Sequence, residues 1–166
     1  PTLYAAYSAR ERQLLLLDDF TDARITPVSL IRSQMGSTGD TTQINAMFEE
    51  WAAWCAQVYD SHTSLPVLLW FRSKHRGHSW ITGLGVVTDA AITFAALVPD
   101  AERGPAMKLY RQSLRLVTGL AERVGLDPNP EVGPLDSRLW SVGYSAFEQF
   151  GVPMRSFDDS LARSRA

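Results

Sequence analysis

The chain has 166 residues, of which 45% are hydrophobic and 20% charged, and its formal net charge is −2. These proportions are typical of a folded globular protein and argue against a disordered or fibrous one. The small acidic excess argues against a nucleic-acid binder held mainly by phosphate contacts. The single cysteine, Cys55, excludes an intramolecular disulfide and favours a reducing compartment.

Apolar residues recur at helical spacing along most of the chain, and no stretch alternates polar and apolar residues between hairpin turns. We therefore expect an all-α fold, a single domain spanning 1–166 built as a bundle of about six or seven helices. The expected helices cover residues 3–20, 27–32, 42–60, 66–75, 79–98, 107–124 and 136–150. A last short helix should follow Pro153, and we expect flexible loops near 36–42 and 126–136 and a frayed tail at 162–166.

The first two expected helices have recognisable ends and faces. In residues 3–20 the polar run SARERQ, residues 8–13, interrupts the apolar residues and is expected to form a solvated face. Thr26 followed by Pro27 is typical of a helix N-cap with proline at the first helical position.

Residues 42–60 carry the clearest helical stripe, with seven apolar side chains at i, i+3, i+4 and i+7 spacing. They are Ile44, Met47, Phe48, Trp51, Trp54, Cys55 and Val58. Such a stripe normally forms core, so a ligand-stacking role for its two tryptophans is the weaker interpretation.

The longest apolar run, residues 79–98, is expected to form a buried central helix. Ser79 should cap this helix and Trp80 should open it. Its length would also suffice to cross a bilayer, but Asp89 at its centre would be unfavourable in lipid. A helix buried within a soluble bundle is therefore the better interpretation.

The segments around this run complete the expected core. Pro66 should open a short buried helix over 66–75, and Gly83 and Gly85 suggest a close helix crossing. Residues 107–124 should form an amphipathic helix that ends at Gly125. Its expected core residues are Leu109, Tyr110, Leu114, Leu116, Val117, Leu120 and Val124.

Asp89 requires a cation or several hydrogen-bond donors if the helix around it is buried. Arg72 and His75 come from the preceding segment, and we expect an Arg72 to Asp89 ion pair that fixes the angle between two helices. A metal site or general base formed by His62, His75 and Asp89 is a weaker alternative, since no two ligands recur at HxxxH or ExxH spacing.

A third interpretation of this region is an anion-sensing site formed by Arg72, Lys74 and Arg76. No residue is assigned as catalytic or metal-ligating, and we expect no cofactor. The candidate structural or ligand-binding cluster is His62, Arg72, His75, Ser79, Trp80 and Asp89.

Two stretches carry a likeness to a known family, LYAAYSARE at the start and SHTSLPVLLWFRSKHRGHSWITGLGVVTD further on. They resemble the cytosolic C-terminal region of bacterial two-transmembrane, potassium-channel-like ion-channel proteins. The likeness covers most of residues 1–100, although Asp60 replaces the usual glutamate and RGHSW replaces a more acidic or amide-rich linker. The matching residues are Leu3, Tyr4, Ala6, Tyr7, Ser8, Arg10, Glu11, Ser61, His62, Pro66, Val67, Leu68, Phe71, Arg72, Ser73, His75, Ser79, Trp80, Leu84 and Asp89.

The resemblance implies a non-enzymatic regulatory or assembly domain in the cytoplasm, at the inner face of the cell membrane. Pro1 would then mark the start of a fragment that follows a pore-lining helix, and the pore region of the same protein would be its partner. Channel pores form around an axis shared by several subunits, so we expect a homo-oligomer. We expect no nucleic-acid partner and no membrane insertion by this segment.

Overall fold

The computed structural model describes residues 2–18, 25–35, 39–73, 79–98, 102–127, 141, 144, 145, 148 and 154–164. Within these residues the fold is all-α, as the sequence predicts, with six α-helices, one 3-10 helix and no strand. In chain order they are α1 (Leu3–Asp18), α2 (Pro27–Met35), α3 (Thr42–Ser64), η1 (Pro66–Trp70), α4 (Trp80–Leu97), α5 (Gly104–Arg123) and α7 (Phe157–Ser164).

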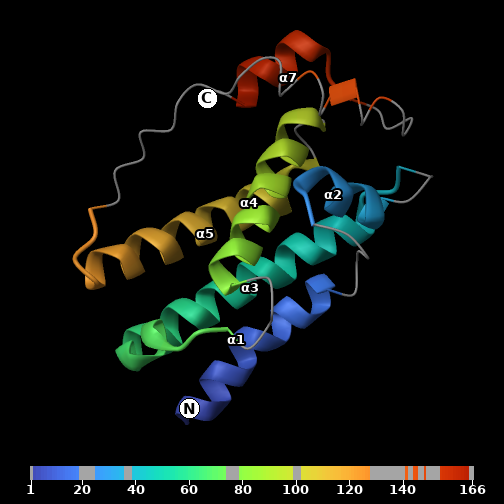
Figure 1. Ribbon diagram of the computed structural model, residues 1–166. Helices are drawn as coiled ribbons and strands as arrows, with labels where there is room; N and C mark the ends of the chain where they lie inside the picture. Colours follow the sequence, from blue (N-terminus) through green and yellow to red (C-terminus); the bar gives the residue numbers. More distant parts are fainter. Residues whose placement is uncertain are drawn as a thin grey trace.

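Two helices organise the bundle (Figure 1). α3, the longest at 23 residues, lies between α1 and α5 and also contacts α2 and η1. α4 packs against α1, α2, α5 and α7, so it holds the position of a central helix. α7 lies at the end of α4 that is far from the amino-terminus of α1 (Figure 1).

Several helix ends form as the sequence predicts. Thr26 accepts a hydrogen bond through its Oγ1 from the Ser29 amide at 3.1 Å, which satisfies a free donor at the start of α2. Ser79 does the same for the Thr82 amide at 3.1 Å, and α4 begins at the next residue. Gly125 has φ of +73° just after α5, a conformation that glycine adopts without strain.

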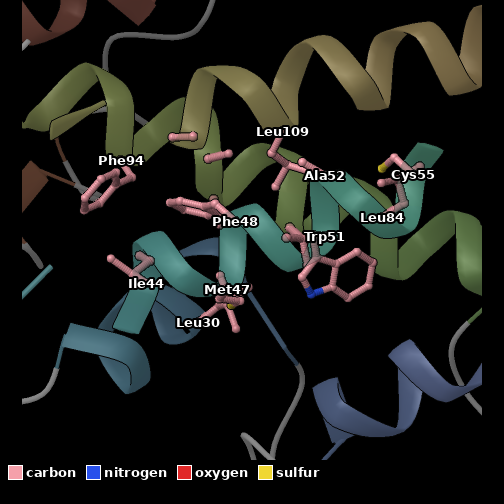
Figure 2. Packing of buried hydrophobic residues seen from close by; sticks show 14 of the residues in the cluster. Leu30, Ile44, Met47, Phe48, Trp51, Ala52, Cys55, Leu84, Phe94 and Leu109 are labelled. Carbon is pink, nitrogen blue, oxygen red and sulfur yellow. The ribbon is translucent and has the colours of Figure 1, made fainter. Parts of the chain in front are cut away.

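The core is built on the stripe of α3, and all seven of its predicted core residues are buried. Phe48 meets Phe94 of α4 with ring centroids 5.5 Å apart, and Trp51 lies 5.0 Å from Trp54. Figure 2 shows the rings of Phe48 and Phe94 close together, and Ala52 beside Leu109. Trp51 and Trp54 are almost completely buried, so they are core residues and are not a stacking platform on the surface.

α4 is long and apolar enough to cross a membrane by length and composition, with a mean hydropathy of 1.5. In the structure ten of its residues are buried against neighbouring helices. A close crossing is present at Gly83, where an added Cβ would lie 2.7 Å from Leu14 Cδ2 of α1. At Gly85 such an atom would meet nothing within 4 Å, so the predicted crossing involves one glycine and not both.

Three expectations about local burial are wrong. The segment after Pro66 forms only a 3-10 helix ending at Trp70, and Leu68 is its one buried residue. α5 leaves Leu114 and Val117 about half exposed, because its apolar arc is wider than the face that α3 and α4 cover. In α1 the run expected to be solvated contributes two buried residues, Arg10 and Glu11.

Other predictions concern residues outside those that the structure describes. They include His75, Lys74 and Arg76, most of the expected helix over 136–150, and the end of the tail. Much of the two predicted loops, near 36–42 and 126–136, also lies there.

Candidate functional site

The main polar feature of the interior is the side chain of Arg10, which is only 1% exposed. It lies on the buried face of α1, one turn after Tyr7 and one turn before Leu14. A guanidinium so far from water requires anionic and hydrogen-bonding partners around its plane.

Four groups from three parts of the chain satisfy Arg10. Its Nε donates to Glu11 Oε1 at 3.0 Å, and Nη2 lies 2.9 Å from the same oxygen. Nη1 donates to the Leu68 carbonyl at 3.1 Å and faces His62 Nε2 at 3.2 Å. Nη2 also donates to the Phe71 carbonyl at 2.9 Å. One side chain thus connects α1 with the end of α3, with the middle of η1 and with the residue that follows η1.

Aromatic rings enclose the guanidinium. The Arg10 Cζ lies 5.1 Å from the Tyr7 ring centre and 5.5 Å from that of Trp80, within cation–π range. Trp80 also packs against the His62 ring, with centroids 5.7 Å apart. These contacts add the first turn of α4 to the site.

Ser73 extends this network. Its Oγ donates to Glu11 Oε1 at 3.2 Å and accepts from the Trp80 amide at 3.1 Å. The Tyr7 hydroxyl donates to the Arg72 carbonyl at 3.0 Å. We refer to the residues whose side chains meet here as the Arg10 cluster: Tyr7, Arg10, Glu11, His62, Ser73 and Trp80.

His62 is fully buried, and its surroundings define its protonation state. Its Nδ1 lies 2.9 Å from the Val58 carbonyl, which can only accept, so Nδ1 carries the proton. Nε2 is then the acceptor that faces Arg10. Burial lowers the pKa of His62 to about 4, the positive charge of Arg10 adds to this effect, and the bond to the Val58 carbonyl opposes it.

A cavity of about 340 Å³ lies beside the Arg10 cluster, between α1 and α3. Small side chains of α1 form one wall, and the last turns of α3 form the other. Its lining residues are Ala5, Ala6, Ala9, Arg10, Trp54, Gln57, Val58, Asp60 and Ser61.

Two members of the sequence-predicted cluster, His62 and Trp80, meet in the structure. Ser79 is the N-cap of α4, and His75 lies outside the described residues. Arg72 contributes its carbonyl oxygen, and its side chain is exposed.

The predicted Arg72 to Asp89 ion pair is wrong. Asp89 is exposed, because it falls on the outer side of α4 with Ile81 and Gly85, and no ion pair joins it to Arg72. Partial burial by the surrounding apolar helix raises the pKa of Asp89. Since the carboxyl group still reaches water, its charged form needs no cation buried beside it.

The cluster has the chemistry of a structural connection. In the described part of the chain no three histidine, cysteine, aspartate or glutamate side chains converge as metal ligands would. Both nitrogens of His62 are engaged within the protein. Cys55 is buried against Ser113, and burial raises the pKa of its thiol to about 11, so it is a poor nucleophile.

The burial of Arg10 and Glu11 was not predicted, although the sequence contains a signal for it. Tyr7, Arg10, Glu11 and Leu14 are spaced as one helical face, so the charged pair continues the apolar stripe of α1.

Comparison of the chain with models of protein families, with curated proteins and with solved structures gives no match.

Proposed function

We propose that this chain is the cytosolic regulatory or assembly domain of a bacterial potassium-channel-like membrane protein, without catalytic activity of its own. One observation supports this most. Six of the residues that carry the family resemblance come from two stretches about 50 residues apart in the sequence, and their side chains meet in one network. The first stretch supplies Tyr7, Arg10 and Glu11, and the second supplies His62, Ser73 and Trp80.

A network of this kind suits a domain in which a movement of one helix is passed to its neighbours. Arg10 fixes α1 through directional bonds to His62 and to two carbonyl groups, Leu68 O and Phe71 O. A rotation of α1 about its axis would break these bonds together, because all of them start from one side chain. A displacement that entered through α1 would therefore reach η1 and the end of α3 as a unit.

Assembly would use an apolar helix face that the protomer leaves uncovered. On α5, Leu114 is 50% exposed and Val117 is 48% exposed, and Val124 follows at 41%. They share one side of the helix at i, i+3 and i+10 spacing, which suits packing against a helix of a second copy. The chain would then form a homo-oligomer around the axis of the pore.

The reading frame upstream of Pro1 tests the assignment directly. Two apolar spans of about 20 residues on either side of a Thr-Gly-rich loop would support it. A start codon immediately before Pro1 would contradict it. If the spans are present, potassium uptake by cells that express the whole protein should change when Arg10 is replaced by alanine and stay unchanged with Arg12→Ala, an exposed position on the same helix.

Oligomerisation is measured separately by light scattering on the purified chain. We expect a mass of more than one protomer, which falls to one protomer when Leu114 and Val117 are both replaced by serine. A wild-type chain that stays monomeric at all concentrations would contradict assembly through this face.

A further inference from the structure

Five apolar side chains are exposed around the amino-terminal end of α1 and η1. Trp70 is 79% exposed and Tyr4 is 73% exposed, and Leu3, Val67 and Phe71 are each more than a third exposed. These five residues are termed the aromatic surface. Single exposed apolar residues are ordinary on proteins, but a group of large ones in one place marks an interaction site.

The two segments that carry the aromatic surface pack against each other. The rings of Tyr7 and Phe71 lie 5.9 Å apart, and the Tyr7 hydroxyl bonds to the carbonyl of Arg72. Tyr4 precedes Tyr7 by one turn on the same side of α1. Leu68, which is fully buried, holds η1 against this helix. Figure 1 shows the amino-terminus of α1 and the segment after α3 at the same end of the molecule.

The sequence that follows α3 is basic although the whole chain carries −2. Between Asp60 and Asp89 the sequence has no acidic residue, whereas it has Arg72, Lys74 and Arg76. The side chain of Arg72 is exposed directly after the aromatic surface. The two later residues lie outside the described part of the chain and are not included in this surface.

We propose that the aromatic surface binds the surface of an anionic bilayer, with the rings of Trp70 and Tyr4 among the headgroups and Arg72 facing lipid phosphates. Tryptophan and tyrosine favour the bilayer interface because one part of each ring system is apolar and another is polar. Arginine binds phosphate through charge-assisted hydrogen bonds. No helix crosses the bilayer in this arrangement.

The proposal deepens the proposed function, since it names a lipid partner for the same domain and rests on that function only for placing the domain near a membrane. It also gives the Arg10 cluster a second consequence. Arg10 bonds to the carbonyls of Leu68 and Phe71, and these bonds hold the aromatic surface in position on α1. Lipid binding and the position of α1 would therefore be coupled.

Co-sedimentation of the 166-residue chain with vesicles tests the proposal. We expect binding to vesicles of phosphatidylcholine with phosphatidylglycerol to be at least about tenfold tighter than to phosphatidylcholine alone, and to weaken as salt rises. Arg72→Gln should weaken binding to the anionic vesicles about fivefold. Trp70→Ala should weaken it about tenfold, because a large ring no longer leaves water.

Two controls identify the surface involved. Leu126→Ala removes a 64% exposed apolar side chain that is outside the aromatic surface, and it should leave binding unchanged. Brominated lipids should quench tryptophan fluorescence in the wild-type chain. When Trp140, which lies outside the described residues, is replaced by phenylalanine in both chains, Trp70→Phe should still bind but lose most of this quenching, because Trp51, Trp54 and Trp80 are buried.

Three results would overturn the proposal. They are a wild-type chain that binds no vesicle or shows no preference for anionic lipid, a Trp70→Ala chain that binds as well as the wild type, and a mass in solution that falls to one protomer with Trp70→Ala. The third result would assign this surface to contact with a second copy. None of them bears on the upstream reading frame, so failure here and failure of the proposed function remain distinguishable.

Discussion

His62 should make the folded state sensitive to mild acid. Burial and the neighbouring Arg10 lower its pKa from 6.5 to about 4 in the folded state. Between these two pH values the unfolded chain binds more protons at this residue than the folded chain does. The contribution to the free energy of unfolding is therefore fully present above about pH 6.5 and is lost as the pH falls toward 4.

The size of the effect follows from the same pKa difference. A tenfold change in proton affinity corresponds to about 1.4 kcal/mol. The pKa difference between the unfolded and folded states therefore contributes roughly 3 kcal/mol to the free energy of unfolding. Between pH 7 and pH 5 the expected loss is about 2 kcal/mol. For a domain of this size, such a loss is a large part of the total stability.

Urea unfolding at pH 7, 6 and 5 measures this loss, with His62→Gln as the reference. Glutamine can accept a hydrogen bond from Arg10 and cannot ionise in this range. Subtracting the two free energies of unfolding cancels the carboxylates, including Asp89, whose raised pKa acts in the opposite direction.

The reasoning would be refuted by a free-energy difference between wild type and His62→Gln that stays constant within about 0.5 kcal/mol from pH 7 to pH 5. A nuclear magnetic resonance titration gives an independent check. A pKa of 6.5 or above for the His62 imidazole in the folded protein would also refute it.

Three further predictions concern packing and burial. Arg10→Ala should lower the free energy of unfolding by about 3–5 kcal/mol, because it breaks the buried ion pair with Glu11, whereas the exposed Arg12→Ala should change it by less than about 0.5 kcal/mol in a urea titration. Gly83→Val should destabilise by about 1–3 kcal/mol through overpacking against α1, while Gly85→Ala should stabilise by up to about 1 kcal/mol; thermal unfolding of both would decide. The thiol of Cys55 should react with a chromogenic disulfide reagent only as fast as the protein unfolds, and rapid labelling in native buffer would contradict its burial.

Helix positions were predictable where a local physical signal exists. Thr26 and Ser79 each have a side-chain oxygen that accepts a free amide at a helix start, and Gly125 has the positive φ that ends α5. The stripe of α3 was predictable because its spacing leaves one apolar face. These features depend on neighbours within a few residues.

The candidate site was predictable only in part, since it depends on partners far along the chain. Asp89 was expected to be buried because its sequence neighbours are apolar, but the orientation of α4 places it on the outer side. Arg10 was expected to be solvated because its neighbours are polar, but the packing of α1 against α3, η1 and α4 covers it. Packing between helices decides that Arg10 enters the core and Asp89 does not. The sequence pattern of a single helix does not determine this.

A guanidinium is an unusual choice for a core position, since an apolar side chain of similar volume is often at least as stabilising. Arg10 instead provides hydrogen bonds, whose strength depends on the orientation of α1. Dispersion contacts such as those of Leu14 and Leu17 tolerate small shifts of α1 along its neighbours, whereas the bonds to Leu68 and Phe71 require one rotation and one height. Removal of any partner also leaves a charge buried, so intermediate positions of α1 are unfavourable. The cluster thus restrains α1 to one rotation and one height relative to η1 and the end of α3.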